Sequence, residues 1–160
     1  MQFTNNEDIE ASIEQTFGAV SDFENFERLA LRRGAEIQRT DDLRCHGVGM
    51  TWKGMFDLRG TERAFKATIL EFDEPHVVCG LVDTDGVDVE LEINLIALSP
   101  NRTRLKVDVN LKPRTLSARL ILQSARLAKN NLNRRFKQKV QNFAQDIEKY
   151  YGTSRASHQR

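Results

Sequence analysis

A single apolar stripe at helical spacing runs through the end of the chain and constrains the fold more than any other feature. After Pro113, apolar residues recur every three or four positions, as on one face of an amphipathic helix. The stripe consists of Ile121, Ala125, Ala128, Leu132, Phe136, Val140, Phe143, Ile147 and Tyr150. A helix over 115–150 is ~54 Å long, whereas a globule of 160 residues is about 40 Å across. We therefore expect the helix to overhang or to bend, with Asn130-Asn131 as its weakest point.

Before that helix the pattern changes to the two-residue period of strands. Val87–Leu95 is apolar at every odd position and polar at every even one, and Thr103–Leu111 repeats this pattern. Turn-forming residues at Ser99–Arg102 join the two strands as a hairpin. Further strands are predicted at 1–11 (weakly patterned), 35–40, 48–58, 61–72 and 76–83, with a tight turn at Asp85-Gly86. Short connections between consecutive strands predict an antiparallel sheet.

Two capping-box patterns predict short helices directly after the first strand. In Ser12–Gln15 and Ser21–Glu24, a serine is followed three residues later by a Gln or Glu. The serine hydroxyl and the later side chain can each accept a hydrogen bond from the other residue's backbone N–H. The predicted helices are 13–20 and 22–32, and Gly34 supplies a stop for the second. The sequence thus predicts an α+β domain: one strand, two short helices, six strands and one long helix.

Length and composition limit the chain to one domain. With 160 residues, 39% of them hydrophobic, it can bury a core. It has neither the apolar run of about 18 residues that a transmembrane helix requires nor a secretory signal. Cys45 and Cys79 lack paired spacing, which indicates reduced thiols and a cytoplasmic location. We expect residues 1–151 to form the domain and the polar residues 152–160 a flexible tail.

Charge is divided between the sheet region and the C-terminal helix. Residues 1–111 hold 12 Lys and Arg against 21 Asp and Glu, whereas residues 112–160 hold 12 against 2. The basic face opposite the apolar stripe contains Arg119, Arg126, Arg134 and Lys137. This face is either a solvated complement to the acidic sheet or a weak contact for an anionic membrane or partner. Nucleic acid fits poorly, because the net charge is only +1 and aromatic residues do not alternate with basic ones.

No signature of metal, cofactor or catalytic chemistry is visible in the sequence. The three histidines lack the spacing of metal ligands, and no G-x-S-x-G motif is present. Gly47-Val48-Gly49 leads into a strand rather than a helix, unlike a dinucleotide-binding loop. We therefore predict no cofactor and assign no catalytic residue.

A curved sheet and one long helix can enclose either a solid core or an apolar cavity, and both have the same composition. Arg63, Gln123 and Ser124 are the polar groups best placed to orient a ligand. Arg63 shares strand parity with Phe65, although a bulge in the strand would reverse this. The alternative interpretation is that Arg63 is an ordinary surface arginine. The candidate ligand-contacting residues are Met50, Trp52, Phe56, Arg63, Phe65, Leu91, Ile93, Leu105, Val107, Leu120, Gln123 and Ser124.

Several short segments, in order along the chain, resemble one known superfamily. They are Ile9–Phe17, Val20–Phe23, Gly49–Trp52, Arg59-Gly60, Thr103–Leu105 and Pro113–Leu120. Together with the order of strands and helices over about residues 1–150, they resemble the START-like superfamily, also called SRPBCC. Ser12 stands where that superfamily often has proline, and serine caps a helix well.

The resemblance implies a helix-grip fold, in which the sheet wraps the C-terminal helix and leaves a hydrophobic tunnel. The implied function is a carrier or sensor that binds a small hydrophobic molecule or lipid. A polyketide-type cyclase, aromatase or dehydratase acting in the same cavity is the enzyme alternative. Binding of an anionic membrane or partner through the basic face is a further alternative. The resemblance transfers no catalytic residue and leaves the ligand and the oligomeric state open.

Overall fold

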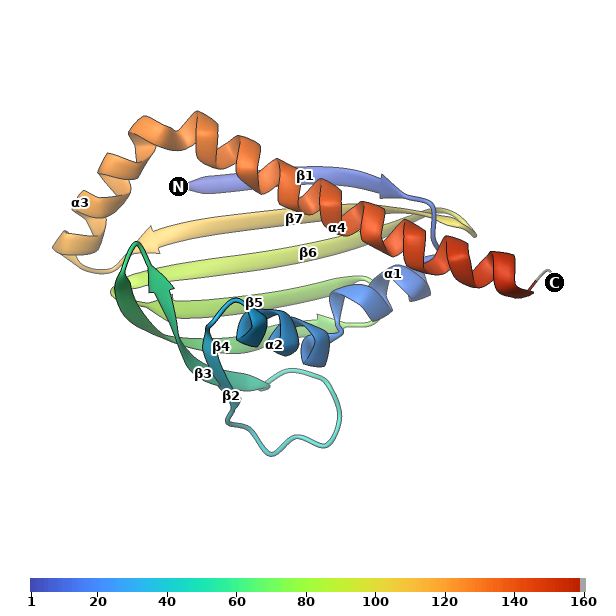
Figure 1. The fold of residues 1–160 in the computed structure, drawn as a ribbon, viewed down its shortest axis with the longest axis horizontal. Helices are drawn as coiled ribbons and strands as arrows, with labels where there is room; N and C mark the ends of the chain where they lie inside the picture. Colours follow the sequence, from blue (N-terminus) through green and yellow to red (C-terminus); the bar gives the residue numbers. More distant parts are fainter. Residues whose placement is uncertain (159–160) are drawn as a thin grey trace.

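A curved antiparallel sheet holds one long helix against its concave face (Figure 1). The structure, a computed structural model, describes residues 1–158. In this part of the chain the elements are β1 (Gln2–Ile9), α1 (Ile13–Val20), α2 (Phe23–Arg32), β2 (Glu36–Arg39), β3 (Thr51–Leu58), β4 (Thr61–Asp73), β5 (Val77–Thr84), β6 (Val87–Ser99), β7 (Arg102–Pro113), α3 (Leu116–Ala125), the 3₁₀ turn η1 (Arg126–Ala128) and α4 (Lys129–His158). The strand order is β1-β7-β6-β5-β4-β3-β2. The predicted α+β helix-grip fold is confirmed.

Tight turns connect the central strands and fix their register. In the β5–β6 turn, Asp85 and Gly86 have φ values of 44° and 77°. Positive φ at both central positions is the turn geometry whose twist matches that of the flanking strands. The β3–β4 turn repeats it, with φ values of 53° at Arg59 and 79° at Gly60. The predicted turn at Asp85-Gly86 is therefore confirmed.

The register also decides which side chains share the concave face. Trp52 pairs with Ala67, and four residues further along β3 Phe56 pairs with Arg63. Directly opposite residues of an antiparallel pair lie on the same face of the sheet. The irregularity in β4 lies between Ile69 and Glu71, beyond this stretch. Arg63 therefore keeps the parity predicted from the sequence.

The two short helices begin differently from each other. At α1 the predicted capping box is complete: the Gln15 N–H donates to Ser12 Oγ (3.1 Å) and the Ser12 N–H donates to Gln15 Oε1 (3.0 Å). The second predicted box is wrong, because Asp22 caps α2 by accepting from the Asn25 N–H at 3.2 Å. Ser21 instead donates to the Phe17 carbonyl at 2.7 Å. Because only two residues separate the helices, Ser21 caps the C-terminus of α1 instead of the N-terminus of α2.

The C-terminal helix bends, but not where propensity alone places the break. The predicted weak point at Asn130-Asn131 is wrong, because the bend is the 3₁₀ turn η1 and both asparagines lie inside α4. Beyond the turn, the predicted stripe from Leu132 to Ile147 faces the sheet, whereas Ile121 and Tyr150 are exposed. Residues 159–160 lie outside the described residues, and the flexible tail over 152–160 stays a prediction.

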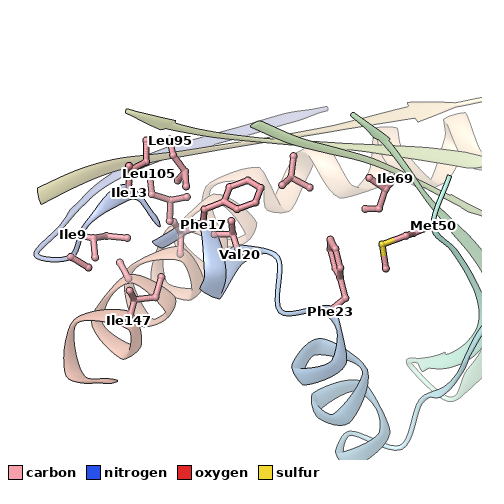
Figure 2. Close-up of a cluster of buried hydrophobic side chains, with 14 of the residues drawn as sticks. Ile9, Ile13, Phe17, Val20, Phe23, Met50, Ile69, Leu95, Leu105 and Ile147 are labelled. Carbon is pink, nitrogen blue, oxygen red and sulfur yellow. The ribbon is translucent and has the colours of Figure 1, made fainter. Parts of the chain in front are cut away.

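The tightest packing lies at one end of the sheet, where α1 is wedged between the strands and α4 (Figure 2). Phe17 and Ile147 from the two helices meet Leu105 from β7 there. Thr103 is fully buried and donates its hydroxyl to the Ala11 carbonyl at 2.9 Å. Because this end is filled by side chains, any cavity has to lie further along the concave face.

Truncation of Ile147 tests whether α4 is essential to the fold. Ile147→Ala is expected to lower the free energy of unfolding by about 2–5 kcal/mol, since it removes a buried side chain from the core. The matched control is Leu127→Ala in the turn η1, where the side chain is exposed and the expected change is under about 0.5 kcal/mol. Equal effects in chemical denaturation would contradict the packing described above.

Candidate functional site

An apolar cavity of about 450 Å³ lies between α2, α4 and the concave face of the sheet. Small-molecule sites in proteins typically measure about 300–1,000 Å³. Its lining is Val20, Phe23, Phe26, Ile69, Val78, Gly80, Leu91, Ile93, Leu105, Val107, Phe136, Lys139, Val140 and Phe143. Lys139 is the one charged residue in this lining, so the cavity offers dispersion and hydrophobic contacts and very few hydrogen bonds.

The floor of the cavity is built from paired residues of neighbouring strands. Gly80 on β5 pairs with Ile69 on β4 and with Leu91 on β6, so the three form one row across the sheet. The next row consists of Val78, Ile93 and Val107. Both rows point to the concave face, because pairing across strands preserves the side.

Gly80 gives the floor part of its depth. A Cβ atom at this position would lie 3.6 Å from the Thr68 carbonyl oxygen and 3.8 Å from Ile69 Cδ1, which is ordinary van der Waals contact. The backbone therefore does not require glycine here. The missing side chain leaves open space between Ile69 and Leu91.

The roof and the rim come from helices. Phe136, Val140 and Phe143 follow one another at helical spacing on α4 and face the floor. The rings of Phe143 and Phe26 lie 6.0 Å apart, so α2 and α4 meet across the cavity. Lys139 is exposed and contributes at the rim, where its aliphatic stem can cover apolar surface.

A second hollow of about 160 Å³ adjoins the first and shares Phe23 and Phe26 with it. Trp52 lines this hollow and is only 6% exposed. Its indole Nε1–H donates to Glu27 Oε1 at 2.7 Å. A buried indole N–H usually requires a hydrogen-bond partner, and here a carboxylate on α2 supplies it.

The sequence-predicted site residues fall into five places. Leu91, Ile93, Leu105 and Val107 line the larger cavity, and Trp52 lines the smaller hollow. Met50 is fully buried in the core. Phe56, Arg63 and Phe65 share the concave face but lie outside both linings. Leu120, Gln123 and Ser124 are exposed on α3, outside both linings.

The placement of the last three residues follows from the bend. Because η1 redirects the chain, α3 does not continue the roof that α4 forms over the sheet (Figure 1). Ser124 donates its hydroxyl to the Leu120 carbonyl one turn earlier, at 3.1 Å. Their assignment as ligand contacts stays a prediction.

Eight aromatic and aliphatic side chains in the cavity wall were missed by sequence reasoning. They are Val20 on α1, Phe23 and Phe26 on α2, Ile69 on β4, Val78 on β5, and Phe136, Val140 and Phe143 on α4. The last three belong to the predicted apolar stripe, where spacing alone does not separate a cavity roof from a packed core. The two phenylalanines on α2 are three residues apart, a spacing that places them on one helix face.

Arg63 carries the most unusual polar group on the concave face. Its Nη1 donates to Asp85 Oδ2 in the β5–β6 turn, and the side chain is partly buried. Its Nε–H is buried and has no hydrogen-bond partner within residues 1–158. An unpaired buried donor costs about 1–3 kcal/mol, so an acceptor at this point would be favourable.

The loop over 40–50 packs beside the wall that both cavities share. The rings of His46 and Phe23 lie 5.1 Å apart, and His46 Nε2 lies 2.9 Å from Glu24 Oε1. Asp41 organises the loop by accepting from Arg39 Nε at 2.9 Å and from the Thr51 N–H at 2.9 Å. The Arg39 guanidinium holds the pKa of Asp41 well below its usual range.

Acidification tests the role of Asp41. Its carboxyl titrates near 3.9 when unpaired, so a lowered pKa in the folded loop means that ionised Asp41 stabilises the loop. That stabilisation is complete at pH values above the ordinary pKa of an aspartate. It is lost only as the pH falls through the lowered pKa of Asp41 in the folded loop. The Thr51 amide shift in NMR is expected to titrate below pH ~3.9, and Asp41→Asn should abolish this step. A midpoint at or above the ordinary value would contradict the assignment.

The Trp52–Glu27 contact is tested by two substitutions of one residue. Glu27→Ala leaves the buried indole N–H without its acceptor and is expected to cost about 1–3 kcal/mol of stability. Glu27→Gln keeps an acceptor oxygen and should cost clearly less. Trp52 is the only tryptophan, so its emission, expected to be blue-shifted in the wild type, reports the site directly. Emission typical of water-exposed indole in the wild type would contradict this geometry.

The described part of the chain contains neither a metal-binding cluster nor a membrane-spanning helix. Among the described residues, no three His, Cys, Asp or Glu side chains converge as a metal site requires. Within residues 1–158, no helix has both the length and the apolar character to span a membrane. Burial raises the pKa of the Cys79 thiol to about 11, so this thiol stays protonated at neutral pH.

Known proteins resemble this chain in structure but not in sequence. No protein-family model matches the sequence, and no curated protein sequence matches it. Among solved structures, the Zhui aromatase/cyclase from Streptomyces sp. R1128 has a TM-score of 0.65 at 11% identity, covering 92% of this chain and 93% of that one. Norcoclaurine synthase from Thalictrum flavum has a TM-score of 0.64 at 12% identity, covering 94% and 96%.

A START superfamily protein from Mycobacterium smegmatis is also similar, with a TM-score of 0.51 at 19% identity over 86% of this chain and 97% of that one. In all three cases the likeness extends over nearly the whole of both chains. Identities this low establish a shared fold and nothing finer. The chain therefore has the START-like, or SRPBCC, helix-grip fold.

Proposed function

We propose that the protein is a cytoplasmic carrier or sensor that binds a small hydrophobic molecule or lipid between the sheet and α4. The observation that carries the proposal is the cavity of about 450 Å³, whose lining is apolar except at Lys139. Burial of an apolar ligand there contributes about 25 cal/mol per Å² of surface removed from water. The lining favours ligands with few polar groups, because it offers almost no hydrogen-bond partners to repay their desolvation.

Proteins with the same fold support a small-molecule ligand. One of the similar structures is an aromatase/cyclase. Norcoclaurine synthase has been solved in complex with dopamine and hydroxybenzaldehyde. These are properties of those proteins, and they support the choice of ligand class for this chain because an apolar cavity is present here as well.

The enzyme alternative is a polyketide-type cyclase, aromatase or dehydratase acting in the same cavity, and one observation favours it. Arg63 lies on the same concave face, outside the lining of either cavity, and presents a buried Nε–H without a partner in the described part of the chain. It would contact a substrate that extends from the cavity along this face. A guanidinium in such a setting can stabilise negative charge developing on a substrate oxygen. Turnover of a poly-β-carbonyl substrate that is lost in Arg63→Leu, with apolar-probe binding retained, would favour the enzyme over the carrier.

Filling the floor of the cavity tests the main proposal. Gly80→Leu places a side chain into the open space between Ile69 and Leu91, and its Cβ atom is accommodated without a clash. Affinity for the neutral fluorescent probe N-phenylnaphthylamine is expected to fall at least about tenfold. The control Leu81→Phe enlarges the adjacent residue, which has the opposite strand parity and faces the convex side.

Circular dichroism and denaturation midpoints establish that both variants are folded. Native mass spectrometry of freshly purified wild type then shows whether a small molecule is retained. Equal probe affinity in wild type and Gly80→Leu would contradict binding at this cavity.

A further inference from the structure

Helix α3 and the turn η1 present three leucines away from the protein. Leu116 and Leu120 on α3 and Leu127 in η1 are 72%, 56% and 93% exposed. The spacing of four residues places Leu116 and Leu120 about 40° apart on the helix. The opposite side carries Ala118, which is buried, and Leu122 and Ala125, which are partly buried. We call Leu116, Leu120 and Leu127 the leucine stripe.

The leucine stripe is flanked by cations that the rest of the protein does not neutralise. Between residues 112 and 139 there are nine Lys and Arg and no Asp or Glu. Lys112 and Arg114 are paired with acidic residues of the sheet. Among the side chains of residues 1–152, by contrast, Arg119, Arg126 and Lys129 form no ion pair. The stripe and these three cations thus form one surface that is both apolar and positively charged.

The charge of this surface decides which partner fits it. In a symmetric contact between two copies, Arg119 and Arg126 of each copy would approach those of the other. No carboxylate within 112–139 could compensate that repulsion. Single-stranded nucleic acid is bound through aromatic side chains as well as cations, and α3 and η1 contain no aromatic residue. An anionic lipid surface fits both the leucine stripe and the cations beside it. The leucines can enter the interfacial region of the bilayer while the arginines contact the lipid phosphates.

We propose that α3 and η1 dock this protein on an anionic bilayer, with the leucine stripe inserted and Arg119, Arg126 and Lys129 at the headgroups. The bend at η1 makes this possible, because it separates α3 from the part of the helix that covers the cavity. None of these residues lines either cavity. Docking and ligand binding can therefore be lost independently of each other.

Vesicle co-sedimentation of the full chain tests the proposal. Vesicles of phosphatidylcholine with one quarter phosphatidylglycerol are compared with pure phosphatidylcholine, at low salt and at about 0.5 M NaCl, where screening is strong. The wild type is expected to pellet with the anionic vesicles at low salt and to be released by salt. The double variant Leu120→Ser/Leu127→Ser should lose at least about tenfold in affinity, and Arg119→Gln/Arg126→Gln should bind more weakly with a shallower salt dependence.

Matched controls use other exposed residues of the same chemical kind, away from α3 and η1. Leu70→Ser/Ile96→Ser removes two exposed apolar side chains from strands, and Arg32→Gln/Arg33→Gln removes two exposed cations at the end of α2. Both controls are expected to bind vesicles like the wild type. N-phenylnaphthylamine binding, measured in parallel, should be unchanged in Arg119→Gln/Arg126→Gln, because both residues lie outside the two cavities.

Three results would overturn the docking proposal. One is equal binding of the wild type to anionic and neutral vesicles. Another is wild-type affinity in Leu120→Ser/Leu127→Ser, which would make the leucines irrelevant to docking. The third is a dimer in analytical ultracentrifugation that this double variant dissociates, since the stripe would then be covered by a second copy.

Discussion

The mismatch in width between the sheet and the helix that covers it shapes the rest of the molecule. The strands of residues 1–158 form a sheet of seven, which at ~4.8 Å per strand spacing is about 29 Å wide. A helix with its side chains is only about 10–12 Å across. Helix α4 therefore covers one part of the concave face, and α1 and α2 cover another (Figure 1). Apolar rows of the sheet that no helix reaches become the floor of a cavity.

The same constraint explains why the core and the cavity lie at different places along the sheet. Where α1 enters between the strands and α4, side chains such as Phe17 fill the space completely. Beyond the end of α1 the chain turns away into α2, and contact with α4 continues through the rings of Phe26 and Phe143. The floor at that point includes Gly80, which has no side chain to rise into the gap. The hollow therefore follows from the short length of α1 together with one missing side chain.

Much of this fold is predictable from the sequence because its signals are local. Strand parity placed Leu91, Ile93, Leu105 and Val107 on one face, and these residues line the cavity. The capping box at Ser12 is equally local. The sequence predicted that the long helix would overhang or bend, but helix propensity placed the weak point at Asn130-Asn131 rather than at 126–128. The role of Glu27 as acceptor for Trp52 was also missed, since the two residues are joined only by the fold.

The orientation of α3 runs against what stability alone would favour. A helix that serves only to cover a sheet buries its large apolar residues and exposes its small ones. Here Ala118 is buried and Leu122 is partly buried, whereas Leu116 and Leu120 of α3, and Leu127 of η1, face outward. Burying these exposed leucines would contribute about 25 cal/mol per Å² of surface removed from water. The sequence therefore forgoes folding free energy at α3, as expected where an apolar surface is kept for a partner outside the chain. In α4, which has the sheet to cover, the larger side chains Val140 and Ile147 face inward.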